Sequence, residues 1–328
     1  MDPVTHGLTG AAAALLFSDK EHVRPAALAG ALSAMSADLD IFIASQSDPL
    51  LNLEMHRQFT HAFIFIPVGS LLISALLFLF LKRTTSFKKL YLFSFAGLCT
   101  AGLLDACTSY GTQLLWPFLD TRISWSVVSI LDPVITAGLI LFVLLGVIRK
   151  DKRYGILSLS WILIFLAYGW FQQNRAEKAA SVFAAEQQHT PTEFVVKPTL
   201  GNQLLWRVNY MHNGRIYAIA VRAGIFSDIR IYQGGSSPLI IPEKDFAEYA
   251  GTTLFEDIKR FETLSDGYLV RHPEQPNVIG DARFSMLPDS MTPLWGIKIN
   301  TQEPGQHPEF LYFRDSGPEV RDAYVKML

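Results

Sequence analysis

Histidine and aspartate side chains recur at the ends of apolar stretches in the N-terminal half of the chain. They lie in six short groups, which are Thr5-His6, Asp38-Leu39-Asp40, His56-Arg57, Thr60-His61, Asp105 and Asp132-Pro133. Imidazole nitrogens and carboxylate oxygens together are the ligand set of a catalytic zinc or a similar divalent metal. Ionisable residues at the ends of membrane helices are costly to bury and usually have a function. The pattern therefore predicts a membrane-embedded metal site.

The segment His56-Arg57-Gln58-Phe59-Thr60-His61 is the most informative of these groups. It contains two imidazoles and a guanidinium in one short run. A catalytic metal needs neutral imidazoles and ionised carboxylates, with one coordination position left open for water. Asp38, Asp40 and Asp105 are the candidate carboxylates. Arg57 suits a phosphate or carboxylate substrate, because its planar fork binds two oxygens at once.

Each group also has a structural interpretation. A single histidine at a helix end more often caps the helix or lies at the membrane interface than binds a metal. Asp38 and Asp40 would serve equally well as loop-capping carboxylates, and Asp132-Pro133 is favoured as an ordinary helix start. Thr5 and Thr60 are each candidate helix caps placed one residue before a histidine. The joint metal site is still favoured, because all these residues are expected on one face of the membrane.

Composition divides the chain into a membrane part and a soluble part. Half of the 328 residues are apolar, and the net charge is close to zero. Residues 1–171 hold nearly all the long apolar runs and are predicted to form a multi-helix membrane domain that carries the metal site. Residues 172–190 are expected to be a linker helix, followed by a soluble domain at residues 191–328. No basic cluster alternates with aromatic residues, so nucleic acid is not suggested as a partner. Cys99 and Cys107 are interpreted as buried thiols rather than as a disulfide or metal ligands.

The membrane domain is expected to be an α-helical bundle of about six helices, two of them short. The clearest span is Phe63–Leu81, which carries no charge and can cross a hydrocarbon core that needs ~20 residues. Further spans are expected at residues 90–104, 127–148 and 154–171. The shorter runs at residues 8–17 and 26–37 are rich in alanine and glycine, which let helices approach closely. These two runs are therefore expected to form a tight hairpin inside the bundle.

Lysine and arginine residues indicate on which side of the membrane each loop lies. They gather between the members of each helix pair, at Lys20 and Arg24, at Lys82, Arg83, Lys88 and Lys89, and at Arg149, Lys150, Lys152 and Arg153. Basic loops stay in the cytoplasm. Alternation then places residues 38–61, residues 105–126 and everything after residue 171 outside the cytoplasm. The histidine and aspartate groups all fall on that outer face.

Residues 191–328 are expected to form a small α+β domain with a mostly antiparallel sheet. Strands are predicted at residues 194–196, 204–210, 216–221, 268–271, 294–299 and 309–313, with Asn213-Gly214 as a hairpin turn. An amphipathic helix is predicted at residues 245–262. No catalytic motif is found in this region, and His212, His272 and His307 are expected to be surface residues.

At this point the chain resembles the YdjM family of membrane-bound proteins, which are predicted to be metal-dependent hydrolases. The resemblance covers about residues 1–150 and rests on Thr5-His6, Asp38-Leu39-Asp40, the His-Arg-x-x-Thr-His run at 56–61, Leu103-Leu104-Asp105, Tyr110-Gly111-Thr112 and Leu115-Trp116-Pro117-Phe118. That family is thought to be distantly similar to zinc-dependent phospholipases C and single-strand nucleases, helical enzymes whose histidines and aspartates hold several zinc ions. The resemblance therefore implies metal-dependent cleavage of a phosphate ester.

The residues and the resemblance together give each candidate a role. The predicted ligands of a divalent metal, zinc or alternatively manganese, are His6, Asp38, His56, His61 and Asp105. Asp40 is predicted to be a further ligand or a general base, and Arg57 and Arg122 to hold the substrate phosphate. Family members often have a histidine one helical turn before the aspartate that matches Asp105, where this chain has Ala101. A lower metal count, a substitute ligand and loss of activity are the three alternatives that Ala101 leaves.

The leading hypothesis is a membrane-bound metal-dependent hydrolase that acts on a phosphate ester or lipid-linked substrate at the outer membrane face. The alternative is a non-enzymatic anchor or binding protein with a structural His/Asp metal site. A transporter is disfavoured because no charge lies at the centre of a span. The expected location is the bacterial inner membrane, crossed several times, with the C-terminal domain outside the cytoplasm. The lipid bilayer and a lipid or phosphate-ester substrate are the expected partners.

Overall fold

The computed structural model describes residues 1–328, and the chain divides into two compact units. The membrane unit comprises Met1–Ile43, Met55–Phe171 and Leu200–Asn202. The C-terminal unit comprises Ala44–Glu54, Gln172–Thr199 and Gln203–Leu328. The sequence did not lead us to expect that Ala44–Glu54, which lies between two of the histidine and aspartate groups, would pack within the C-terminal unit.

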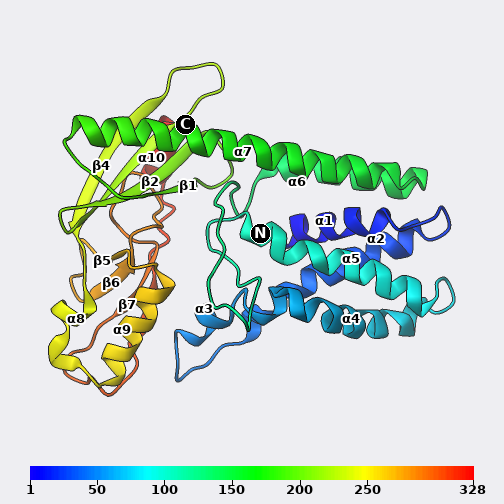
Figure 1. Cartoon of the computed structure of the whole chain (residues 1–328), viewed down its shortest axis with the longest axis horizontal. Helices are drawn as coiled ribbons and strands as arrows, with labels where there is room; N and C mark the ends of the chain where they lie inside the picture. The colour runs from blue at the N-terminus through cyan, green and yellow to red at the C-terminus, as the bar shows by residue number, and fades with distance from the viewer. The chain divides into compact units, whose positions relative to one another are not determined.

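Six longer helices build the membrane unit (Figure 1). They are α1 (Pro3–Leu15), α2 (Val23–Ser36), α4 (Ile66–Leu81), α5 (Phe87–Ala106), α6 (Pro133–Arg149) and α7 (Arg153–Glu186), the last of which continues into the C-terminal unit. Three segments are long and apolar enough to cross a membrane, namely Phe63–Leu81, Phe87–Ala106 and Arg153–Glu186, whereas α6 is a shorter apolar helix. Large apolar side chains on the outside of α4, such as Leu72 and Phe80, are exposed, as lipid contact requires.

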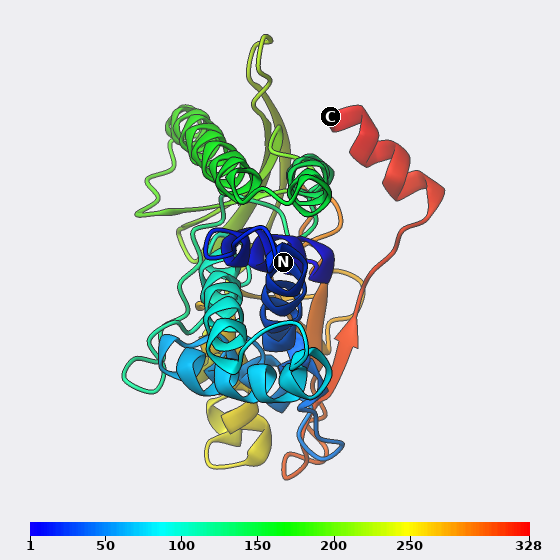
Figure 2. The same cartoon turned by 90° about the vertical axis from the view of Figure 1, so that its right-hand side faces the viewer.

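Helices α1, α2 and α5 pack against one another at almost backbone distance (Figures 1 and 2). A Cβ atom added at Gly10 would lie 2.3 Å from the carbonyl oxygen of Gly30, and one added at Gly30 would lie 2.3 Å from that of Gly10. A Cβ atom at Gly97 of α5 would likewise lie 2.3 Å from the Gly30 carbonyl oxygen. The expected tight hairpin of small residues is therefore present, and α5 closes onto it.

Gly10→Ala is expected to destabilise the membrane unit, because its methyl group would meet the backbone of α2 rather than a side chain that can move. We expect a loss of about 1–3 kcal/mol, the range for overpacking a close-packed interior. Gly7→Ala on the same helix is the matched control, since its Cβ atom would meet the flexible end of Met35 at 3.0 Å. Thermal unfolding in detergent compares the two variants. Equal unfolding temperatures for the two variants would show that α1 and α2 pack less closely at Gly10 than described.

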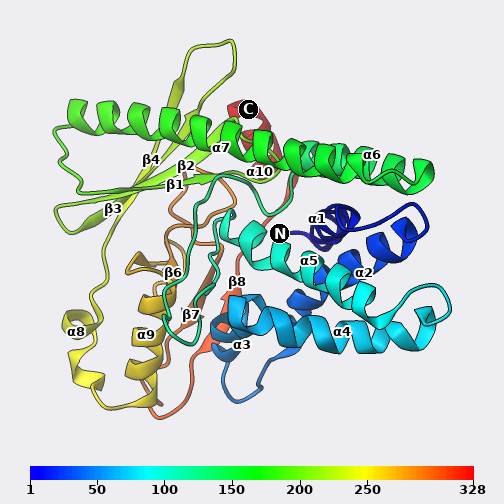
Figure 3. The ribbon, with the colours of Figure 1, turned by 45° about the vertical axis from the view of Figure 1, so that its right-hand side comes forward.

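The basic residues lie at one end of the membrane unit. Figures 1 and 3 show the α1–α2, α4–α5 and α6–α7 turns at the same end of the helices. Lys89, at the start of α5, donates a hydrogen bond to Asp19 of the α1–α2 turn at 2.9 Å. The short 3₁₀ elements Ala37–Phe42 and Phe59–His61, which carry two of the six histidine and aspartate groups, lie at the other end of the helices.

Two expectations for this unit need correction. The helix expected at residues 127–148 begins only at Pro133, because Asp132 accepts hydrogen bonds from the amides of Val134 and Ile135 and caps it. Asp132 is therefore a helix start, as its structural interpretation held. Thr5 is not a cap, because Asp2 caps α1 and accepts from the amide of Thr5 at 3.0 Å.

The first sheet of the C-terminal unit contains β1 (Phe194–Pro198), β2 (Leu205–His212), β3 (Arg215–Arg222) and β4 (Arg230–Pro238), in that order and all antiparallel. The predicted turn at Asn213-Gly214 joins β2 to β3, with both residues at positive φ. The second half of α7 packs on this sheet, where its alanines Ala176 and Ala180 contact Trp206 and Val208 in one core.

The second sheet is also antiparallel and contains β5 (Leu269–Arg271), β6 (Val278–Asp281), β7 (Trp295–Lys298) and β8 (Glu309–Tyr312). Helix α9 (Thr253–Leu264) lies against it (Figure 3), and its buried Ile258 and Phe261 share a core with Leu269 and Ile297. The chain ends in helix α10 (Pro318–Met327).

The sequence misplaced some of these elements. The helix expected at residues 245–262 is broken into α8 (Pro242–Asp245), a 3₁₀ turn at Ala247–Tyr249 and α9, because Gly251 adopts φ +80° and Thr252 caps a new helix. His272 is not at the surface: it is 4% exposed, and its ring accepts hydrogen bonds from the amides of Glu274 and Gln275.

Lys197 of β1 gives the C-terminal unit an expected dependence on pH. Burial and the nearby Arg283 guanidinium lower the pKa of Lys197 to about 7. An unfolded chain holds this proton up to a pKa of about 10.4. Between these two values the unfolded state binds more protons than the folded state, so stability should rise from pH ~7 to pH ~10. Lys197→Met should flatten that rise in thermal unfolding, and an unchanged slope in the variant would assign it to another group.

Candidate metal centre

Four separate elements bring His6, Asp38, His61 and Asp105 together. His6 lies in the first turn of α1, and Asp105 lies in the last turn of α5. Asp38 belongs to the 3₁₀ turn that follows α2, and His61 ends the 3₁₀ turn that precedes α4. Because the helices run in alternating directions, these ends meet at one end of the unit. We call these four residues the ligand group.

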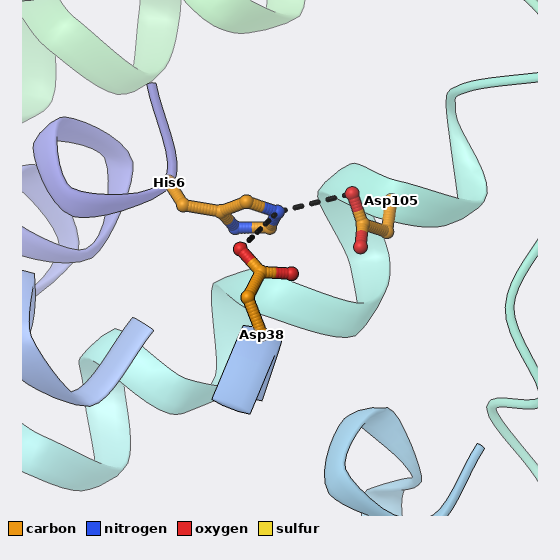
Figure 4. A group of neighbouring side chains, drawn as sticks. All are labelled: His6, Asp38 and Asp105. Carbon is orange, nitrogen blue, oxygen red and sulfur yellow. Dashed lines mark hydrogen bonds and ion pairs between the residues drawn. The ribbon is translucent and has the colours of Figure 1, made fainter. Parts of the chain in front are cut away.

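His6, Asp38 and Asp105 converge on a point between their polar atoms (Figure 4). His6 Nε2 lies 3.0 Å from Asp105 Oδ1 and 4.0 Å from Asp38 Oδ2. One ligand atom from each of the three residues lies within 4.8 Å of the others. Atoms that share a zinc ion at about 2.0–2.2 Å have to lie within about 4.5 Å of each other, so this spacing is close to what a bound metal requires.

His61 completes the ligand group from the opposite element. Its Nε2 atom lies 3.1 Å from Asp105 Oδ2 and 3.5 Å from Asp38 Oδ1. His6, His61 and Asp105 are at most 2% exposed, whereas the side chain of Asp38 is 21% exposed. Access to the ligand group is therefore from the side of Asp38.

Several buried polar atoms of the ligand group make no hydrogen bond of good geometry, although His61 Nε2 lies at ion-pair distance from Asp105 Oδ2 and Arg57 Nε lies 2.8 Å from the same oxygen. The atoms without such a hydrogen bond are His6 Nδ1, Asp38 Oδ2, His61 Nε2 and Asp105 Oδ2. A buried polar atom without a partner is costly, and native proteins usually satisfy it. Three of these atoms, Asp38 Oδ2, His61 Nε2 and Asp105 Oδ2, are among those through which the four residues approach one another. Two imidazoles and two carboxylates with open lone pairs fit a divalent cation such as zinc or manganese.

Asp40 supports the ligand group without being part of it. Its carboxylate accepts hydrogen bonds from the Arg57 amide at 2.8 Å and from the Thr60 hydroxyl at 2.7 Å, and it bonds His56 Nδ1 at 2.7 Å. It also lies 3.3 Å from His61 Nδ1, on the side of that ring away from Asp105. A carboxylate behind a metal-binding imidazole fixes the ring and its tautomer. His56 is directed to Asp40 and does not join the ligand group.

Arg57 and Arg122 lie beside the ligand group around one aromatic ring. Arg57 Nε lies 2.8 Å from Asp105 Oδ2, and its Nη1 donates to the Thr108 hydroxyl at 2.8 Å. The guanidinium carbons of Arg57 and Arg122 lie 5.5 Å and 5.2 Å from the centre of the Tyr110 ring. Arg122 also donates to the carbonyl oxygen of His56 at 2.9 Å. The Arg57 guanidinium is thus held next to Asp105, and that of Arg122 over the same Tyr110 ring.

Charges within the site are closely balanced. Burial by itself lowers the pKa of His61, but the carboxylates of Asp105, Asp38 and Asp40 outweigh burial and raise the pKa to about 10. An imidazolium, the Arg57 guanidinium and the amino group of Met1, which forms an ion pair with Asp105, therefore face three aspartates. A divalent cation would replace the proton on His61 as a positive charge at the same place.

Both cysteines are free, and Cys107 is buried as expected, whereas Cys99 is only partly buried. Cys107 follows Asp105 by two residues and donates to the carbonyl oxygen of Leu103 at 3.3 Å. Burial raises the pKa of Cys107 to about 12. The cluster of possible ligand atoms around His6, Asp38 and Asp105 contains no sulfur, so the donor set of the site consists of nitrogen and oxygen.

The match to a family model covers the part of the chain that carries this site. The model described as YdjM inner membrane protein matches residues 1–176. The chain belongs to the YdjM inner membrane protein family. No curated protein matches the chain, and no solved structure matches it. This YdjM protein is a membrane protein, and its residues after 176 lie outside the family match.

The YdjM chain differs from the expected family pattern at Ala101, one turn before Asp105. Ala101 is fully buried and shares an apolar cluster with Ala37, Ile66 and Leu98, against which Cys99 packs. The four members of the ligand group thus come together without a residue at position 101.

Sequence reasoning missed three supporting residues of this YdjM site. Thr60 was taken as a cap, but its hydroxyl donates to Asp40 and lies 2.9 Å from His61 Nδ1. Thr108 accepts from Arg57, and Tyr110 lies between two guanidinium groups. Tyr110 stood in a segment of the family resemblance, which was the available signal for it. Nothing in the sequence singled out Thr108.

Proposed function

We propose that this protein is a membrane-bound, metal-dependent hydrolase that cleaves a phosphate ester, with a lipid-linked ester as the favoured substrate. The observation that carries the proposal is the ligand group, in which two buried imidazoles and two carboxylates from four elements converge with polar atoms that make no hydrogen bond of good geometry. Membership of a membrane protein family and the apolar helices support a substrate that is reached at the bilayer.

His6, Asp38, His61 and Asp105 are proposed to hold the cation, zinc in the first place and manganese as the alternative. A cation bound there would activate water and stabilise negative charge that develops on the phosphate. Asp38 is the most exposed member of the group, and the open coordination position is expected on its side. His56, which we had predicted as a ligand, is assigned instead to orient Asp40.

Arg57 and Arg122 are proposed to bind the phosphate of the substrate. Both guanidinium groups lie over the Tyr110 ring, and Arg57 also contacts Asp105. Fork-shaped donors suit phosphate oxygens, and their charge offsets the charge of the ester. Asp40, which accepts three hydrogen bonds, is assigned to hold the His61 ring rather than to act as the general base.

We further propose that the site faces the outside of the cytoplasm, together with the C-terminal unit, in a chain that crosses the membrane several times. The basic turns at the other end of the helices support this orientation. Ala44–Glu54 lies between Asp40 and His56 in the chain and belongs to the C-terminal unit, which supports the part of the proposal that keeps the site and this unit on one side of the bilayer.

An assay of the purified protein tests the activity. In detergent, the protein is expected to release phosphate or a phosphoalcohol from phosphatidic acid or phosphatidylglycerol, to stop in the presence of a chelator, and to recover with zinc or manganese. Asp38→Asn should lower the rate by at least about 100-fold. A rate that is the same in Asp38→Asn as in the wild type would contradict the proposal. Metal binding without turnover on either lipid would favour the non-enzymatic alternative.

A further inference from the structure

The segment Ala44–Glu54 connects two residues that contact each other within the site. Asp40 precedes it and His56 follows it, and the two side chains form a hydrogen bond of 2.7 Å. The loop is thus closed at its base by the carboxylate that supports His61. Its tip does not pack within the membrane unit, because Ala44–Glu54 belongs to the C-terminal unit.

Leu50 holds the tip of this segment in an apolar core. It is 0% exposed and packs with Leu254, Ile258 and Phe261, while Leu53 covers the edge of the same core. A leucine side chain that is completely buried stabilises the packing of its segment on the core. The segment is therefore fixed to α9 and is not a free linker.

Arg260 of α9 holds the same segment by ion pairs. It donates to both carboxylate oxygens of Glu54 at 2.7 and 2.8 Å, and to both oxygens of Asp48 at 2.9 and 3.1 Å. Asp257, one turn earlier on α9, accepts from the same guanidinium at 2.6 Å. Paired contacts of this kind fix orientation as well as charge. We call Arg260, Asp48 and Glu54 the clasp.

The same carboxylates resemble a cation site, because ligand atoms of Asp48, Asp257 and His307 lie within 4.8 Å of one another. The guanidinium of Arg260 already supplies a positive charge to Asp48 and Asp257. His307 in turn lies 2.6 Å from the second oxygen of Asp257. The cluster is thus explained by the arginine, and it acts as a contact between the segment and α9.

We propose that the C-terminal unit controls the metal centre through this segment, with Arg260 as a positioning residue. While the clasp is closed, the loop ends are fixed, so that Asp40 and His56 stay paired and His61 is held toward Asp105 and Asp38. When the clasp opens, the loop gains freedom and the support behind His61 loosens. The proposal rests on the proposed function only where it concerns the metal, because the effect on the loop ends is independent of any ion.

Hydrogen exchange measures the effect on the loop ends in full-length protein without added metal. Arg260→Ala is expected to speed amide exchange in residues 55–61 by about tenfold. The Arg57 amide donates a hydrogen bond to Asp40, and this bond should open more often when the segment is no longer held by Arg260. Lys259→Ala is the matched control, since Lys259 pairs with Glu243 and Glu262 on the other side of α9 and does not contact the segment. The double variant Asp48→Asn/Glu54→Gln removes the two negative charges of the segment that bind Arg260, and it changes no residue of α9.

Zinc titration of the same proteins measures the consequence for the site. Arg260→Ala and the Asp48→Asn/Glu54→Gln variant should each weaken zinc binding about tenfold, and their combination should weaken it no further. This non-additivity is expected because both changes break the same ion pairs, and it would show that they weaken zinc binding through the clasp.

Two results would distinguish a failure of the positioning role from a failure of the proposed function. Unchanged exchange in residues 55–61 of both clasp variants would overturn the positioning role, whatever the zinc titration shows. Faster exchange with a wild-type protein that binds no zinc would retain the positioning role and contradict the proposed function.

Discussion

Asp105→Asn is expected to weaken zinc or manganese binding by at least about 100-fold in detergent-purified protein. Asp105 contacts both histidines of the ligand group and is fully buried, so no water can take its place without rearrangement. The asparagine keeps the shape of the side chain but loses the charge and one acceptor atom. Competition with a fluorescent zinc chelator gives the dissociation constant.

Asp132→Asn is the matched control for this substitution. Asp132 is also buried at a helix end, but its carboxylate caps α6 and belongs to no cluster of metal-ligating residues. The variant should keep the cap of α6, because asparagine caps helices about as well as aspartate, and it should bind metal as the wild type does. Equal loss of metal affinity in both variants would mean that general damage to the bundle, and not a lost ligand, explains the effect.

Arg57→Met is expected to destabilise the membrane unit by about 3 kcal/mol in chelator, because Asp105 loses its arginine partner while it stays buried. Arg57 is 5% exposed, and its Nε atom lies 2.8 Å from Asp105. Saturating zinc should recover part of this loss, since the cation supplies the positive charge that Asp105 lacks. Thermal unfolding with and without zinc measures the difference.

Arg122→Met provides the comparison, since Arg122 is more exposed than Arg57 and donates a hydrogen bond to the backbone carbonyl oxygen of His56. Arg122→Met should lower the unfolding temperature less than Arg57→Met does. Adding zinc should leave the difference in unfolding temperature between Arg122→Met and the wild type unchanged. A zinc effect of the same size in both variants would argue that the metal does not act through Asp105.

The ligand group shows how far residue type and charge patterning can lead. His6, Asp38, His61 and Asp105 were chosen because they end apolar runs on the side opposite the basic loops, and the structure brings them together. Alternating helix directions alone require that such ends meet. The sequence could not distinguish His56 from His61, because the choice depends on a positive φ at Arg57 that turns the chain between them.

Local geometry explains the other differences. Strand β4 was missed because its centre reads Gly-Gly-Ser-Ser, which is not typical of a strand. Position 234 requires glycine, because a Cβ atom there would lie 2.0 Å from the carbonyl oxygen of Asp289. The attachment of residues 44–54 to α9 was missed as well. Leu50 and Leu53 stand in an otherwise polar loop, which was the signal for a buried contact, but no rule of spacing names a partner more than 200 residues away.

X-ray absorption at the metal edge of protein purified without chelators tests the central claim most directly. We predict a bound zinc or manganese ion whose nearest neighbours are nitrogen and oxygen at about 2.0–2.2 Å, with the outer scattering of imidazole rings. The imidazole scattering should fall in His61→Ala. A protein that carries no metal, or a metal with sulfur neighbours at about 2.3 Å, would contradict the account.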